Sequence, residues 1–110
     1  MRGAFGGATR KATYGNPSTS APARAAREAG EGQPCPGCGK TMEGGTNTSP
    51  QAQHSPSLSD HYNEHGGAEM TAAERREYAR STESIDGARC DTCQRTEGLE
   101  QQRKYRDPPK

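Results

Sequence analysis

Large hydrophobic side chains are sparse along this chain and do not recur with the period of a regular core. Val and Trp are absent, and the large aliphatic and Phe side chains are Phe5, Leu58, Ile85 and Leu99. Residues 1–33, rich in Gly, Ala, Ser, Pro and Arg, show neither helical nor strand periodicity. We therefore expect a flexible linker or tail over residues 1–33, followed by a domain over residues 34–106.

Local signals nevertheless predict several elements. Thr71 and Glu74 form a capping-box pattern, which predicts a helix running from there to Arg80. Weaker patterns predict a short helix at 21–29 that is marginal alone, a loop ending in a short strand at 41–53, and a helix at 94–105. These pieces are too polar to bury a metal-free core, and by composition alone the chain belongs with disordered sequences.

All four cysteines lie in two pairs, Cys35-x-x-Cys38 and Cys90-x-x-Cys93. The spacing lets one turn present two sulfurs to one ion, so two pairs predict a tetrahedral structural Zn²⁺ site. Two disulfides are the alternative, but they need an oxidising compartment, and the start of the chain has no apolar segment typical of a signal peptide. A zinc deaminase would require a histidine before its first cysteine pair, and no histidine precedes Cys35. A thioredoxin-like site would require a βαβ pattern, which the sequence lacks.

The net charge of +1 conceals an asymmetry, since residues 1–33 carry +3 and residues 34–110 carry −2. The predicted domain therefore has no large positive field, and it would have to hold a nucleic acid through local contacts. Two basic groups are candidates for phosphate contacts: Arg75, Arg76 and Arg80 on the predicted helix, and Arg103, Lys104 and Arg106 with Tyr105. A solvated helix face and a frayed basic end are the ordinary interpretations of these two groups.

Three segments in this order resemble the HNH/endonuclease-VII superfamily of treble-clef nucleases, as in bacterial polymorphic toxins. The matching segments are residues 35–39 (CPGCG), 53–56 (QHSP) and 90–98 (CDTCQRTEG), so that the resemblance spans residues 34–106. It implies a small α+β zinc-stabilised domain, a treble-clef or ββα-metal finger, with a disordered N-terminal tail. It also implies a metal-dependent endonuclease that hydrolyses DNA, with RNA as an alternative substrate.

By this resemblance, His54 would be the general base that activates water against a phosphodiester, a task suited to an imidazole pKa near 6.5. A catalytic divalent cation, Mg²⁺ by preference, would be held at the positions of Gln53 and Gln94. Both residues depart from the family pattern, because an amide is a poorer Mg²⁺ ligand than a carboxylate.

A second alignment of the resemblance uses Asp60 beside the cation and His61 as the base, with Gly66 and Gly67 following. The non-catalytic alternative makes His54, His61 and His65 solvated loop residues of a zinc-knuckle module that binds protein or nucleic acid. The sequence alone leaves all three interpretations open.

The resemblance to toxin domains implies a biological setting. The protein would be a delivered bacterial effector acting in the cytoplasm of a target cell, without a signal peptide or membrane anchor. A cognate immunity protein would then be its partner.

Overall fold

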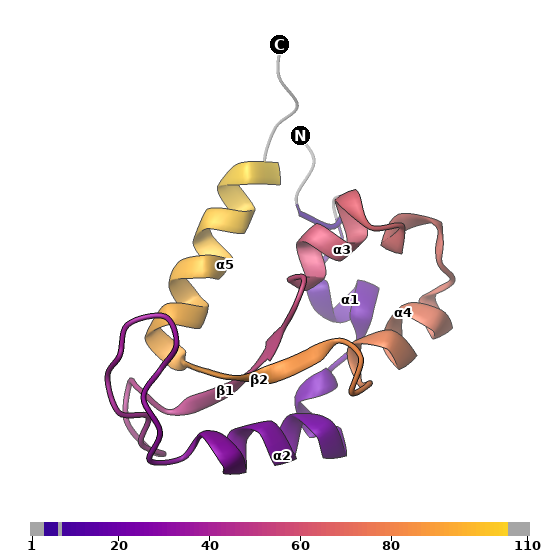
Figure 1. The fold of residues 1–110 in the computed structure, drawn as a ribbon. Coiled ribbons are helices and arrows are strands. Elements are labelled where there is room, and N and C mark those ends of the chain that lie inside the picture. The colour runs from indigo at the N-terminus through magenta and orange to yellow at the C-terminus, as the bar shows by residue number, and fades with distance from the viewer. Residues whose placement is uncertain (1–3, 7, 106–110) are drawn as a thin grey trace.

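A two-stranded antiparallel sheet lies at the centre of the computed structural model, which describes residues 4–6 and 8–105 (Figure 1). The sheet pairs β1 (Pro50–His54) with β2 (Ile85–Cys90). The helices are α1 (Arg10–Tyr14), α2 (Ala21–Gly30), α3 (Leu58–Glu64), α4 (Ala72–Ala79) and α5 (Asp91–Tyr105), with 3₁₀ helices η1 (Pro17–Thr19) and η2 (Gly67–Glu69). The fold is therefore a small α+β domain, as expected.

The register of the sheet shifts just before its end. Pro50 pairs with Cys90 and Ala52 with Ala88, but His54 pairs with Ile85. One residue of β1 thus faces two of β2, and the second of these, Gly87, has a φ of +73°. This is a β-bulge, in which a glycine supplies the left-handed conformation and bends the ladder beside His54.

The structure differs from the flexible tail expected over residues 1–33. Helix α2 packs on both strands of the sheet, as Figure 1 shows. A Cβ built on Gly30 would lie 2.7 Å from the Cβ of Ala88 and 3.1 Å from that of Pro50. This contact is made by small residues, in a segment that has no large apolar side chain. Residues 1–3 and 7 of the expected tail, and Arg106 of the expected domain, lie outside the described residues.

Helix α1 is joined to the segment that carries α4. The Arg75 guanidinium donates to the carbonyl oxygens of Thr13, Gly67 and Met70. Arg80 donates to Asn16 O and Thr19 Oγ1. Arg75 and Arg80 therefore hold the N-terminal segment in place. Arg76 and Arg80 are nevertheless exposed, as a solvated helix face predicts.

The helix at Thr71 is confirmed, and its first turn has the predicted capping box. Thr71 Oγ1 accepts from Glu74 N at 3.1 Å, while Glu74 Oε1 accepts from Thr71 N at 2.7 Å. The helix expected at 94–105 also forms, but it begins at Asp91. The helix follows β2 without a loop, and its first two amides, those of Asp91 and Thr92, donate to Ser49 O and Asn47 O.

Buried side chains form two separate clusters. One contains Tyr14, Leu58 and Ala79, with Phe5, Tyr62 and Tyr78 packed against them. The other contains Cys35, Met42 and Cys90, with Ala88 and Cys93 against them. Cysteines thus make up much of the second core. Across residues 4–6 and 8–105, no helix is both long enough and apolar enough to cross a membrane.

Candidate metal centre and active site

The first cysteine pair lies in a tight hairpin turn. Pro34 and Thr41 form an antiparallel bridge across the turn. Cys35 N donates to Lys40 O at 2.8 Å, and Gly39 N donates to Cys35 O at 2.7 Å. Gly39 has a φ of +80°, a conformation that glycine adopts without steric cost. The turn therefore brings Cys35 and Cys38 to one side of the hairpin.

The second pair lies where β2 passes into α5. Cys90 is the last residue of the strand, and Cys93 lies in the first turn of the helix. The strand-to-helix junction therefore places the second pair of sulfurs on neighbouring elements, with two residues between them in the chain.

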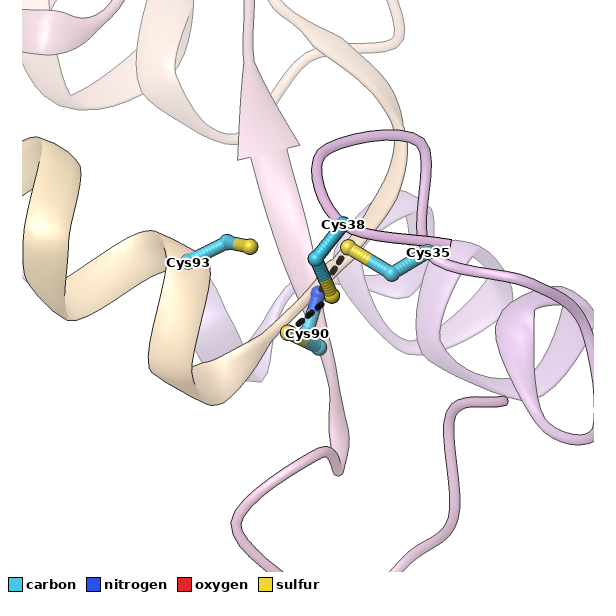
Figure 2. A group of neighbouring side chains, drawn as sticks. All are labelled: Cys35, Cys38, Cys90 and Cys93. Atoms are coloured by element: carbon cyan, nitrogen blue, oxygen red, sulfur yellow. Dashed lines mark hydrogen bonds between the residues drawn. The ribbon is translucent and has the colours of Figure 1, made fainter. Parts of the chain in front are cut away.

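The four sulfurs converge, as Figure 2 shows. All lie within 4.8 Å of one another, and the Sγ atoms of Cys38 and Cys90 are 3.8 Å apart. A tetrahedron with Zn–S bonds of about 2.3 Å has sulfur–sulfur edges of about 3.8 Å. All four cysteines are free, which argues against the alternative of two disulfides. The cluster can therefore hold a metal ion such as zinc, and its donors fit that ion.

Hydrogen bonds stabilise a thiolate at Cys35, one member of this cluster. Burial disfavours the Cys35 thiolate, but amides of Cys90, Gly37 and Cys38 stabilise it and lower the pKa of the Cys35 thiol to about 6. Cys90 N and Gly37 N each donate to Cys35 Sγ at 3.3 Å. Contact with Cys90, followed by burial, raises the pKa of Cys93. A bound divalent cation would favour the thiolate form of all four cysteines, Cys93 included, since metal-bound thiols are deprotonated.

His54 lies at the end of β1, beside the bulge, and its ring is fixed from one side. Its Nε2 lies 2.8 Å from the carbonyl oxygen of Ala79, the last residue of α4. Because a carbonyl can only accept, Nε2 carries the proton and Nδ1 has the free lone pair. Burial lowers the pKa of His54, and the charge of Arg10 lowers it further, against the opposing effect of the Ala79 bond. The neutral imidazole is therefore favoured near pH 7.

His54 is one of the residues that line a cavity of about 610 Å³. Polar side chains around it include Arg10, Arg27, Gln51, Gln94 and Gln101. The walls come from α1, α2, β1, the start of α3, and α5. This volume lies within the range of about 300–1,000 Å³ that is usual for ligand sites. Segments far apart in the sequence thus enclose a space next to a neutral imidazole.

The residues expected to bind a catalytic cation are not gathered there. Gln94 lines the cavity, and its Nε2 donates a hydrogen bond to Ala52 O. This bond leaves the side-chain oxygen of Gln94 free to act as a ligand. Gln53 does not belong to the lining, and the Asp60 carboxylate accepts from Lys104 and Tyr105.

Two carboxylates do reach the cavity, but both are already paired. Asp91 pairs with Arg95 at 3.0 Å, and Glu97 pairs with Arg89 at 2.9 Å. Among the described residues, the cysteines form the only cluster of three or more metal-ligating side chains. One free amide oxygen and two paired carboxylates do not fit a dedicated Mg²⁺ site.

His61 is packed within the aromatic cluster. Its Nδ1 lies 2.7 Å from Tyr14 Oη, and its ring stacks on Tyr78 with centroids 3.8 Å apart. Only 7% of the residue is exposed, and it does not line the cavity. Burial lowers the pKa of His61. His65 is exposed at the C-cap of α3.

The C-terminal basic group is partly neutralised. Lys104 pairs with Asp60 at 3.1 Å and Glu64 at 2.9 Å, and the hydroxyl of Tyr105 donates to both carboxylates. Arg106 lies outside the described residues.

Sequence patterns missed Arg10, Arg27 and Ala79. The first two lay in the expected tail, and the third contributes only a backbone oxygen, which no residue type reveals. The excess positive charge of residues 1–33 was the one available signal.

Comparisons with protein-family models, curated proteins and solved structures found no match for this chain.

Proposed function

We propose that this protein is an HNH-type endonuclease that hydrolyses phosphodiester bonds of DNA, with His54 as the general base. The observation that carries the proposal is the state of His54. Its Nε2 is held by Ala79 O, its pKa is lowered, and the residue belongs to the lining of the cavity. A neutral imidazole with one nitrogen fixed and the other free suits proton abstraction from water.

The arrangement of elements supports the same proposal. The cysteine turn is followed along the chain by β1 ending in His54, then, after α3, η2 and α4, by β2 and α5, with the second cysteine pair at the β2–α5 junction. We take this order as support for the treble-clef or ββα-metal finger that the resemblance of residues 34–106 implies. We infer that a Zn²⁺ held by the four cysteines would fix β2 and α5, and thereby the wall of the cavity.

In the proposed reaction, Nδ1 of His54 takes a proton from a water molecule whose oxygen attacks phosphorus. A new P–O bond forms, the P–O bond to the leaving sugar oxygen breaks, and solvent protonates that oxygen. The Ala79 carbonyl stabilises the imidazolium through its bond to Nε2. Since the donors do not fit a dedicated cation site, no step of this scheme involves Mg²⁺.

The biological setting is part of the proposal. We propose a delivered bacterial effector that acts in the cytoplasm of a target cell and is neutralised by an immunity protein. This setting rests on the resemblance of residues 34–106 to toxin domains.

Nicking of supercoiled plasmid by the zinc-loaded protein tests the catalytic proposal, with and without added Mg²⁺. We expect His54→Ala to lower the rate by about 10²- to 10⁴-fold, the usual contribution of a general base. His65→Ala, an exposed histidine, should leave the rate unchanged. Circular dichroism of each variant checks that its fold is retained.

Two results would overturn this assignment. If the parent protein nicks plasmid in neither buffer, the nuclease proposal fails. If nicking survives His54→Ala but is lost in a folded His61→Ala variant, the base is His61.

A second candidate is a non-catalytic zinc module that binds nucleic acid or protein. The observation that favours it is the missing cation site, since Gln53 is outside the cavity lining and Asp60 is paired. The same assay distinguishes the two, because a binding module would leave the plasmid supercoiled in both buffers.

A further inference from the structure

Two arginines from the N-terminal segment line the cavity that contains His54. Arg10 is the first residue of α1, and Arg27 lies in the last turn of α2. Their charges are therefore brought to the candidate catalytic base from a segment that sequence patterns predicted to be a tail.

Neither guanidinium has a carboxylate partner in the part of the chain that the structure describes. The ion pairs found there involve Arg89, Arg95 and Lys104. Arg27 Nη1 donates to Ser18 O at 2.8 Å, which fixes the side chain but does not neutralise it. A guanidinium carries five N–H donors, so capacity for an anionic ligand remains.

Arg10 is an exposed residue at the start of a helix of five residues. The N-terminal end of a helix carries partial positive charge, where a cation is disfavoured. Arg10 is also close enough to His54 for its charge to lower the pKa of that ring. An unneutralised cation in this position suits a site that receives an anion.

We propose that Arg10 and Arg27 bind a backbone phosphate of the nucleic-acid substrate inside the cavity. This inference rests on the proposed function and deepens it, because it identifies what takes up the phosphate charge where cation ligands are not gathered. Guanidinium groups bind phosphate through paired, charge-assisted hydrogen bonds. Two carboxylates, Asp91 and Glu97, also reach the cavity. Each is already paired with an arginine, so each should repel a bound phosphate only weakly.

The test measures binding separately from cleavage. A fluorescein-labelled DNA duplex is titrated with zinc-loaded protein in the His54→Ala background, and anisotropy is followed at several salt concentrations. Arg10→Gln and Arg27→Gln should each weaken binding by about tenfold. The double variant should also reduce the slope of log K against log salt by about 0.9, the value for one lost phosphate contact.

Each variant has a matched control on its own helix. Lys11→Gln removes the same charge from α1, and Arg24→Gln removes it from α2, yet both residues lie outside the cavity lining. Arg10 and Lys11 are both exposed, so this pair differs in position rather than in exposure. The controls should bind within about twofold of the parent background. Thermal unfolding of Arg27→Gln checks for damage from the lost bond to Ser18, and Arg27→Lys should recover part of the affinity by restoring the charge.

Three outcomes decide the inference. Loss confined to Arg10→Gln and Arg27→Gln supports it. Equal loss in the controls overturns it in favour of general surface charge, and unchanged binding in all four also overturns it.

The result is independent of catalysis. If the parent never nicks DNA but the two arginines still determine binding, the phosphate site stands and the nuclease proposal falls. If nicking depends on His54 while Arg10→Gln and Arg27→Gln match their controls in binding, the nuclease proposal stands and the phosphate site falls.

Discussion

At the scale of single residues, the two histidines that the sequence offers as candidate bases have different surroundings. His54 is held by one backbone carbonyl beside a cavity, whereas His61 is stacked on Tyr78 and bonded to Tyr14. The free lone pair of His54 is available for chemistry. The ring of His61 is instead part of a core.

The lowered pKa of His54 predicts the pH dependence of nicking. In the proposed mechanism the neutral ring is the active form, so the rate should fall as pH drops through the pKa, with a midpoint below the usual value of 6.5. Arg10→Gln should move this midpoint upward, because it removes a positive charge that opposes protonation. The measurement is a pH profile of kcat/KM, and a midpoint above 6.5 in the parent would contradict the assignment.

Gly67 predicts a local effect on stability. A Cβ there would lie 2.7 Å from Tyr62 Cα and 2.8 Å from His61 Nδ1. Gly67→Ala should therefore destabilise the protein by about 1–3 kcal/mol through overpacking of the aromatic cluster. The matched change Gly98→Ala meets no atom within 4 Å and lies inside α5, so it should stabilise by about 0.5–1 kcal/mol. Chemical denaturation measures both, and equal effects would argue against tight packing at Gly67.

At the scale of elements, the β-bulge links backbone conformation to the candidate base. Gly87 in β2 lies opposite the residue of β1 that precedes His54, and its φ is left-handed. A substitution there acts on the path of the strand without steric contact, because a Cβ would meet nothing within 4 Å.

Gly87→Ala should consequently lower nicking more than its stability loss explains. The strain of a left-handed non-glycine residue is about 1–2 kcal/mol. Gly45→Ala is the control, since Gly45 has a φ of +81°, open surroundings and a place outside the sheet. Both variants should unfold at similar denaturant concentrations, and only Gly87→Ala should lose activity. Equal activity in the two would show that the bulge does not orient His54.

At the scale of the whole molecule, metal binding should determine whether the chain folds. The core around Met42 includes Cys35 and Cys90, and the other core is a small aromatic cluster. Structural zinc contributes about 10–16 kcal/mol in small zinc-finger peptides.

A strong chelator should therefore abolish the far-ultraviolet helical signal and the near-ultraviolet tyrosine signal together. Stoichiometric Zn²⁺ should restore both, and Mg²⁺ should not, because thiolates select zinc. Circular dichroism checks this. A tyrosine signal that survives chelation would mean that the aromatic cluster folds without the metal centre.

Spacing alone predicted the four-cysteine cluster, because two turns that each present two sulfurs need one common ion. The capping box likewise predicted α4, since both of its hydrogen bonds are local. The placement of α2 could not be predicted, because Gly30 and Ala23 pack through their small size. The contrast between His54 and His61 depends on the residues that contact each ring. Ala79 contacts His54, and Tyr14 and Tyr78 contact His61. Each of these three residues is distant in sequence from the histidine that it contacts.

The order of the cysteines has a consequence for synthesis on the ribosome. Cys35 precedes Cys90 by 55 residues, which take about 3 to 11 s to translate at 5–20 residues per second. During that interval the nascent chain has two thiols and half of the donors for an ion. The helix that begins at Asp91 and lines the cavity is made later still. A ribosome-bound chain therefore passes through a stage at which His54 has been made but has no completed cavity around it, so hydrolytic capacity would arise only after the second cysteine pair has emerged.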